Sequence, residues 1–284
     1  MAYTISKGKE ANMVNVRIIS KQPAEAGTAR ILKNLQNLGA DVWWNDSGSE
    51  RADVILSRVR GDEPDLKQLL STFTSVVEYS PDWVRIINPP HAVYAATSKK
   101  HQVSTYKAGK IPTPRTLKIT NSTNLAQVIK FLGLPLMIKR DAASNGDGVF
   151  WVNGATNLEN VIKEHEQESL LAQEYIPEGS RTLSMIVIKS QVVASAISVA
   201  QTGKWKTNEQ DGGMWSGYYP DFSQSDLAVH ACEYLGVDIG EVETVITPKG
   251  PLVLCVDPSP HLKIIERVTN INVAELIAKF CLGK

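Results

Sequence analysis

Cysteine, net charge and long apolar runs are all scarce in this chain of 284 residues. Its three cysteines, Cys232, Cys255 and Cys281, are widely spaced and odd in number, which argues against a disulfide framework or a zinc knuckle. Basic and acidic residues balance at 30 each, so the chain lacks the basic field that nucleic-acid binding uses. No apolar run reaches the ~18 residues of a membrane span. We therefore expect a cytoplasmic protein with neither a nucleic acid nor a membrane as its partner.

Two common phosphate-binding fingerprints, G-x-x-x-x-G-K-[ST] and G-x-G-x-x-G, are also absent. Instead, an apolar segment ends in Lys139, a loop of small residues follows at 143–148, and a second apolar segment occupies 149–152. Small residues let backbone amides close over a polyanion, and the lysine adds a positive charge beside them. The pattern indicates a nucleotide phosphate site. The alternative is an ordinary lysine before a hairpin turn.

Strand-like and helix-like segments alternate through the first 90 residues. Strands are predicted at 14–19, 42–44, 53–57 and 75–78, and helices at 24–38 and 66–73. Such alternation is typical of a parallel sheet of Rossmann-like type. We predict a flexible extension at 1–13 and a Rossmann-like domain at 14–90, which Asn88-Pro-Pro90 ends.

The remaining chain mixes helices with antiparallel patterns. Helices are predicted at 92–108, 124–132, 158–167, 226–235 and 271–280, and strands at 115–119, 136–139, 149–152, 170–176, 185–188, 191–197, 241–246 and 252–256. We predict two α+β lobes, at 91–178 and 179–284.

The order of four motifs resembles an ATP-grasp enzyme. Lys99 precedes the turn Ile111-Pro-Thr-Pro114, Lys139 precedes the small-residue loop, Gln173-Glu-Tyr-Ile176 forms a hinge, and Glu243 pairs with Cys255-Val-Asp257. The tail from Ser259 looks most like the RimK-type branch, which contains glutamate-adding ligases and the amino-group-carrier ligases of lysine biosynthesis. The resemblance implies an α/β ATP-grasp fold, two α+β lobes clasping ATP, preceded by a Rossmann-like domain.

The resemblance also implies an ATP-dependent carboxylate–amine ligase that works through an acyl phosphate, chiefly by positioning and charge neutralisation. The expected partners are a small-molecule or peptide acceptor with a carboxylate and an amine co-substrate, and a homo-oligomer is possible. ATP contacts would come from Lys99, Lys139, Ser144, Gly146, Gly148, Gln173, Glu174, Tyr175, Ile176 and Glu178. Lys206, Asn208 and Arg181 would serve catalysis, and Glu243 and Asp257 would hold Mg²⁺, which takes oxygen ligands.

The chain departs from the family at the metal site. Cys255 stands where the family has a glutamate that bridges two magnesium ions, and Asp257 stands where it has an asparagine. A thiolate is a soft ligand and magnesium prefers oxygen, so the swap predicts one retained metal site and a weakened second one. Cys255 itself is interpreted as a small buried residue rather than a nucleophile. The alternatives to a ligase are a pseudoenzyme that binds nucleotide and serves as a binding or regulatory protein, and a kinase-like transfer.

Two further features stay open at this level. His261 replaces the glycine of the family's S-P-G and either contacts substrate or lies in a surface turn. Trp205, Trp215, Tyr218 and Tyr219 form an aromatic cluster in the segment that should face substrate. The cluster is either a substrate wall or a packing anchor.

Overall fold

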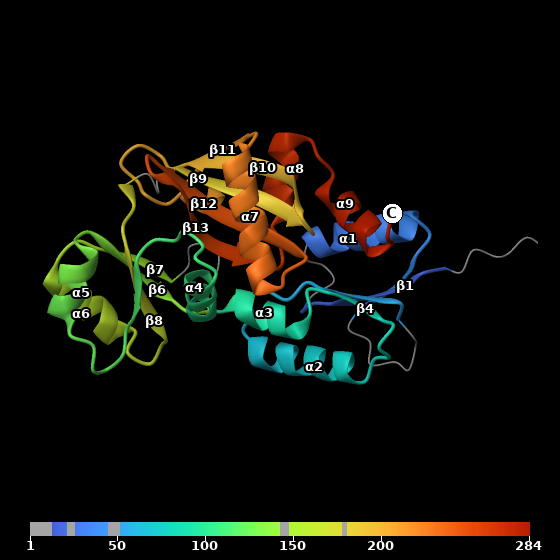
Figure 1. Cartoon of the computed structure of the whole chain (residues 1–284), viewed down its shortest axis with the longest axis horizontal. Coiled ribbons are helices and arrows are strands. Elements are labelled where there is room, and N and C mark those ends of the chain that lie inside the picture. Colours follow the sequence, from blue (N-terminus) through green and yellow to red (C-terminus); the bar gives the residue numbers. More distant parts are fainter. Residues whose placement is uncertain (1–12, 22–25, 45–51, 143–147, 178–180) are drawn as a thin grey trace, which may run out of the picture.

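The computed structural model describes residues 13–21, 26–44, 52–142, 148–177 and 181–284. Figure 1 shows three sheets side by side, each with its own helices. The first sheet lies at one end of the molecule, the five-stranded sheet in the middle and the smallest lobe at the other end. Within the described residues, no helix combines the length and the apolar character that a membrane crossing needs.

The first sheet is parallel, with strand order β2-β1-β3-β4. Its elements are β1 (Asn15–Ile19), α1 (Ala26–Asn37), β2 (Asp41–Trp44), β3 (Val54–Ser57), α2 (Leu66–Glu78) and β4 (Arg85–Ile87). The parallel pairing agrees with the alternation in the sequence. The strand predicted at 75–78 is wrong, because those residues continue α2 and the fourth strand lies at 85–87. Val76 and Val77 follow Phe73 at helical spacing and pack in the same cluster.

Two helices replace the single one predicted at 92–108. They are α3 (Pro90–Thr97) and α4 (Lys99–Ala108). The break falls at Ser98, whose backbone is extended (φ −112°, ψ 115°) and whose hydroxyl accepts a hydrogen bond from the backbone N–H of His101. A serine in this conformation is a good N-cap, so it starts a new helix rather than continuing the old one. As a result, Lys99 becomes the first residue of α4.

The small lobe is built on an antiparallel sheet with strand order β5-β8-β6-β7. Its elements are β5 (Thr116–Lys118), α5 (Leu125–Leu132), β6 (Leu136–Arg140), β7 (Val149–Val152), α6 (Ala155–Glu164) and β8 (Leu170–Glu174). Val128 and Leu158 from the two helices pack against Leu136 and Ile138 of the sheet. This lobe therefore has an apolar core of its own.

The central sheet is antiparallel, with strand order β11-β10-β9-β12-β13. Its elements are β9 (Arg181–Ile188), β10 (Gln191–Val199), the short 3₁₀ helix η2 (Glu209–Asp211), β11 (Met214–Gly217), α7 (Phe222–Leu235), β12 (Ile239–Thr247), β13 (Gly250–Asp257), α8 (Leu262–Thr269) and α9 (Val273–Cys281). The sequence patterns did not predict β11 or α8. Both are short: β11 has only two apolar residues, and the apolar residues of α8 are interrupted by charged ones.

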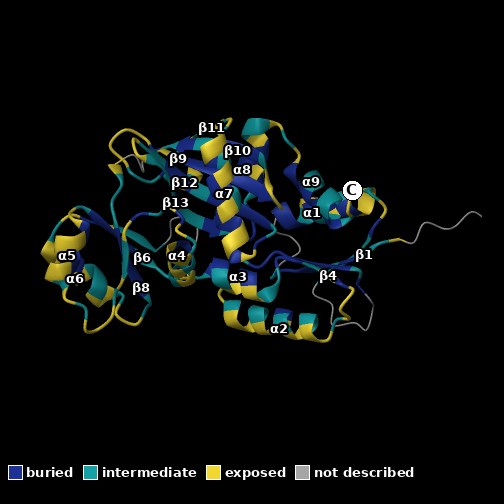
Figure 2. Cartoon of the chain, viewed as in Figure 1, coloured by how far each residue is buried: buried dark blue, intermediate teal, exposed yellow. Residues whose placement is uncertain are grey.

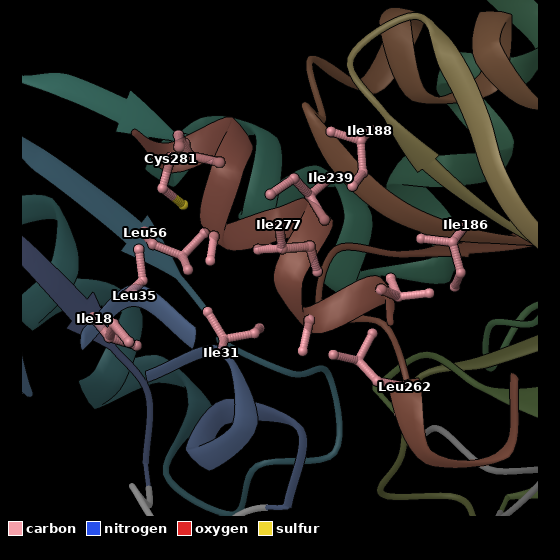
Figure 3. Packing of buried hydrophobic residues seen from close by; sticks show 14 of the residues in the cluster. Ile18, Ile31, Leu35, Leu56, Ile186, Ile188, Ile239, Leu262, Ile277 and Cys281 are labelled. Carbon is pink, nitrogen blue, oxygen red and sulfur yellow. The ribbon is translucent and has the colours of Figure 1, made fainter. Parts of the chain in front are cut away.

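One apolar core joins the first sheet to the central sheet. Figure 3 shows Ile18 and Ile31 on one side, Ile186 and Ile239 on the other, and Ile277 of α9 between them. In Figure 2 this junction is dark blue, while the outer face of α7 is largely exposed. A shared core makes these two sheets one packed unit, whereas the small lobe packs on itself.

Candidate active site

A cavity of about 440 Å³ opens between the small lobe and the central sheet. This size suits a small organic ligand. Lys139 and the hinge 173–176 line it from the small lobe, Lys206, Asn208, Glu243 and Asp257 line it from the central sheet and its loops, and Lys99 lines it from α4. The fold therefore brings together ten of the fifteen residues that the resemblance assigned to ATP, catalysis or magnesium, although they span 159 positions from Lys99 to Asp257.

Two half-buried lysines lie in the wall of the cavity. Lys139 ends the apolar part of β6, and the ammonium of Lys99 donates a hydrogen bond to the backbone carbonyl of Asp141 at 3.2 Å. Burial lowers the pKa of both lysines, and the positive charge of Lys139 lowers that of Lys99 further. Two cations that share a buried wall repel each other, and a polyanion placed between them would relieve this cost.

Acidic side chains face the lysines from the terminal hairpin. In the antiparallel register, Glu243 lies opposite Cys255 and Glu241 lies opposite Asp257. Alternate residues of a strand point to one face, so all four side chains face the cavity. Burial is the main reason why the pKa values of Glu243 and Asp257 are raised, and the charge of Glu241 adds to both.

Sequence reasoning missed Glu241, and it left His261 open between a substrate contact and a surface turn. The Oε2 of Glu241 accepts a hydrogen bond from the backbone N–H of His261 at 2.9 Å and lies 3.6 Å from the imidazole Nδ1. The same Nδ1 lies 4.0 Å from Asp257. His261 thus belongs to the cavity wall. The two-residue spacing of Glu241 from Glu243 on one strand was the available signal.

The Glu241–His261 pair shifts the titration of both groups. Burial alone would raise the pKa of Glu241, but the hydrogen bonds and charge of His261 together lower it. Burial alone would lower the pKa of His261, but Glu241 and Asp257 together raise it. Each partner therefore favours the charged form of the other.

Glu243 and Asp257 fit a magnesium ion whose other ligands come from the phosphates of a nucleotide. Both supply hard carboxylate oxygens, and Mg²⁺ is commonly held by one or two carboxylates together with substrate phosphates. Cys255 does not fit such an ion, because its pKa is raised well above the ordinary value by burial and then by Glu243. In the described part of the chain, no group of three or more His, Cys, Asp or Glu side chains could hold a metal ion without such help.

The hinge 173–176 forms the end of the cavity next to β8. Its Gln173 is buried and donates to the hydroxyl of Thr116 at 2.9 Å. The carboxylate of Glu174 accepts from the backbone N–H and the Nε of Arg115 at 2.7 and 2.6 Å. The carboxylate of Glu174 is therefore bound to Arg115. If Glu174 contacts the adenine, as predicted, its backbone groups would make that contact.

The remaining predicted residues divide into three groups. Lys206 and Asn208 line the cavity on either side of buried Thr207, whose hydroxyl lies 3.0 Å from that of Thr182. Arg181 and Gly148 are not part of the cavity wall, and Arg181 is exposed at the start of β9. Ser144, Gly146 and Glu178 lie outside the described residues.

The aromatic cluster also divides. Trp205 and Trp215 line the cavity, as a substrate wall requires. Tyr218 packs against the core under α7, and Tyr219 is 97% exposed.

Residues 96–281 match the family model of the RimK-like ATP-grasp domain. The chain belongs to this family. One relative, a probable alpha-L-glutamate ligase of Haemophilus influenzae, is 29% identical over 177 residues, which cover 61% of this chain and 58% of the relative. Another, the ribosomal protein bS6–L-glutamate ligase of Salmonella paratyphi B, is 28% identical over 192 residues, 66% of this chain and 64% of the relative. The chain thus spans less than two thirds of each of these RimK-like relatives.

Solved structures support the same fold across nearly the whole chain. A RimK domain ATP-grasp protein from Sphaerobacter thermophilus has a TM-score of 0.71 at 18% identity, covering 95% of this chain and 100% of its own. The ATP-grasp ligase PsnB, complexed with a minimal precursor variant, Mg and ADP, has a TM-score of 0.75 at 14% identity, covering 96% of this chain and 98% of its own. The fold is therefore that of an ATP-grasp protein, as predicted.

Proposed function

We propose that this RimK-like chain is an ATP- and magnesium-dependent ligase that joins a peptide or protein carboxylate to an amine. The observation that carries the proposal is that two half-buried lysines, Lys99 and Lys139, share one cavity beside a hinge with the carboxylates Glu243 and Asp257. Lysines neutralise phosphate oxygens and carboxylates hold the magnesium that accompanies them. One relative is named for ribosomal protein bS6, and the structural neighbour PsnB is complexed with a precursor variant. Both names support a peptide or protein as the carboxylate donor.

In this proposal the reaction has two displacements. A carboxylate oxygen of the first substrate attacks the γ-phosphorus of ATP, the bond to the β–γ bridging oxygen breaks, and ADP leaves. The amine of the second substrate then attacks the carbonyl carbon of the acyl phosphate. The new C–N bond forms, the C–O bond to phosphate breaks, and the amine releases a proton.

The residues of the chain bind and orient the reactants in both steps. Lys99 and Lys139 hold the α and β phosphates, while Lys206 and Asn208 approach the γ-phosphate from the opposite side of the cavity. The hinge receives the adenine through backbone groups. Magnesium bound by Glu243 and Asp257 would neutralise phosphate charge. Placement and charge neutralisation of this kind supply most of the catalysis in phosphoryl transfer.

Calorimetry with a non-hydrolysable ATP analogue, with and without magnesium, tests the nucleotide site. We expect magnesium-dependent binding, and Lys139→Met should weaken it about 10- to 100-fold, the range expected for lost hydrogen bonds to a charged group. Lys118→Met is the matched control, because Lys118 is exposed on β5 and lies outside the cavity wall. Absence of binding by the native chain would sink the proposal.

Turnover is tested separately. ADP and phosphate release should depend on a carboxylate peptide and an amine together, measured over a panel of amino acids and peptides. Nucleotide binding without any turnover across that panel would favour the pseudoenzyme alternative.

A further inference from the structure

Three aromatic rings meet at the rim of the cavity from distant parts of the chain. Trp151 of β7 stacks on Tyr175 of the hinge, with centroids 5.7 Å apart and planes 13° apart. Trp205 meets Trp151 edge-on at 6.4 Å and 87°. The first two rings are carried by the small lobe, whereas Trp205 lies between β10 and η2, beside the central sheet. The cluster therefore bridges the two sides of the cavity.

The segment that carries Trp205 also carries two predicted γ-phosphate residues. Lys206 follows Trp205 directly, and its ammonium lies 5.5 Å from the centre of the Trp205 ring. Asn208 follows Thr207, which is tied to β9 through the hydroxyl of Thr182. On the central side, Glu209 forms an ion pair with Arg267 of α8 at 2.7 Å. This segment is thus anchored to the central sheet at Thr207 and Glu209, and Trp205 links it to the small lobe.

Trp151 is placed to act through its neighbours and not on a ligand. Its ring is 42% exposed and lies outside the apolar core of the small lobe. It does not line the cavity, while Tyr175 and Trp205 do. A ring that is neither core nor cavity wall, yet contacts two wall residues from opposite sides, holds those residues in register with each other.

We propose that Trp151 is a positioning residue: by holding Trp205 against the small lobe, it places Lys206 and Asn208 where the γ-phosphate of a nucleoside triphosphate would lie. This inference rests on the proposed function for the identity of the ligand. It predicts a specific pattern, because a nucleoside diphosphate has no γ-phosphate for Lys206 to meet. Loss of Trp151 should weaken binding of the triphosphate and leave binding of the diphosphate unchanged.

Calorimetry on the full chain with ADP and with a non-hydrolysable ATP analogue, both with magnesium, tests this pattern. Trp151→Ala should raise Kd for the analogue about fivefold, within the range of one aromatic pair, and change Kd for ADP less than about twofold. Unchanged ADP binding also shows that the variant is folded. Trp151→Phe should restore analogue binding to within about twofold, because a phenyl ring can still meet Trp205. Tyr79→Ala is the control, since Tyr79 is 90% exposed and does not line the cavity.

A double-mutant cycle tests whether Trp151 acts through Lys206. In a Lys206→Ala background, Trp151→Ala should have little further effect on analogue binding, because the group that it positions is gone. Equal losses for ADP and the analogue, or full additivity with Lys206→Ala, would overturn the inference while leaving the ligase proposal intact. If the native chain binds neither nucleotide, the proposed function has failed, and the positioning role fails with it.

Discussion

The thiol of Cys255 donates a hydrogen bond to the Oε2 of Glu243, with sulfur and oxygen 3.3 Å apart. The two residues lie directly opposite each other on β12 and β13. Burial raises the pKa of both, and the charge of Glu243 raises that of the thiol further. A neutral thiol thus lies at the position where the family resemblance implies a second carboxylate, and Glu243 is the carboxylate that acts on Lys139. This relationship makes Cys255 the most informative position for substitution.

Cys255→Glu should lower the magnesium concentration needed for half-maximal nucleotide binding, by about tenfold. The new side chain adds hard oxygen ligands, and a tenfold change corresponds to about 1.4 kcal/mol. Without magnesium the same variant should be less stable than the native chain, because a further carboxylate is buried near Glu241 and Glu243. Thermal unfolding with ADP at increasing magnesium concentrations measures both effects. The control is Cys255→Gln, because glutamine has the length of glutamate but no charge. It should show neither the lower magnesium requirement nor the loss of stability without magnesium. An identical response from the glutamate and glutamine variants would contradict the metal-site interpretation.

Stability should depend on pH through Glu241 and His261. The pKa of Glu241 is lowered from its ordinary 4.5, so its contribution is fully present above pH 4.5 and is lost as pH falls through the folded value. The pKa of His261 is raised from its ordinary 6.5, so its contribution is fully present below pH 6.5 and is lost as pH rises through the folded value. The pair should therefore stabilise the fold most between pH 4.5 and 6.5.

Glu241→Gln tests this window. In urea denaturation the variant should lose about 1.5–3 kcal/mol between pH 4.5 and 6.5, the range for a hydrogen bond to a charged group. The difference from the native chain should shrink on both sides of that window. Glu233→Gln is the control, because Glu233 is exposed on α7. A difference that stays constant from pH 4 to 9 would show that the ion pair does not contribute.

Gly213→Ala should displace the segment that carries Lys206 and Asn208. A Cβ at Gly213 would overlap the backbone carbonyl of Thr207. The overlap can be relieved only if the backbone at one of the two residues moves. We expect a loss of about 1–3 kcal/mol in the free energy of unfolding, as for other overpacked sites. Binding of an ATP analogue should weaken as well. Gly154→Ala is a matched control: its Cβ would meet nothing within 4 Å, and its φ of −165° is open to any residue. Similar losses in both variants would argue against the clash.

Asn88 ties the first sheet to the central one. It is fully buried, its amide donates to the carbonyls of Ile239 and Pro258 at 2.7 and 2.8 Å, and its carbonyl accepts from the N–H groups of Asp238 and Ile239. Asn88→Ala should cost about 3–5 kcal/mol, because buried backbone groups lose their partners and alanine is strained at φ +55°.

Asn88→Gly separates these two causes. Glycine accepts the positive φ without strain but makes none of the four hydrogen bonds. In urea denaturation it should recover about 1 kcal/mol of the alanine loss and no more. Native stability in the glycine variant would mean that the hydrogen bonds contribute nothing.

Much of the architecture follows from local sequence. The alternation of apolar segments up to residue 90 predicted a parallel sheet, because parallel strands need a crossover between them. The order of Lys99, Lys139, the hinge and Glu243 carried the resemblance that implied the ATP-grasp fold. The domain boundaries and the possible homo-oligomer stay predictions, and so do the roles of the individual site residues.

Other features were decided only when the chain folded. Val76 and Val77 are helical and pack in one cluster with Phe73, although their β-branched side chains favour a strand. The carboxylate that meets His261 lies 20 residues away, and Trp151 meets Trp205 across 54 residues. Contacts over such separations leave no periodic signal in the sequence, because they are set by how sheets and loops pack. Sequence alone thus determined which chemical groups this protein carries, whereas tertiary packing decided which of them face each other.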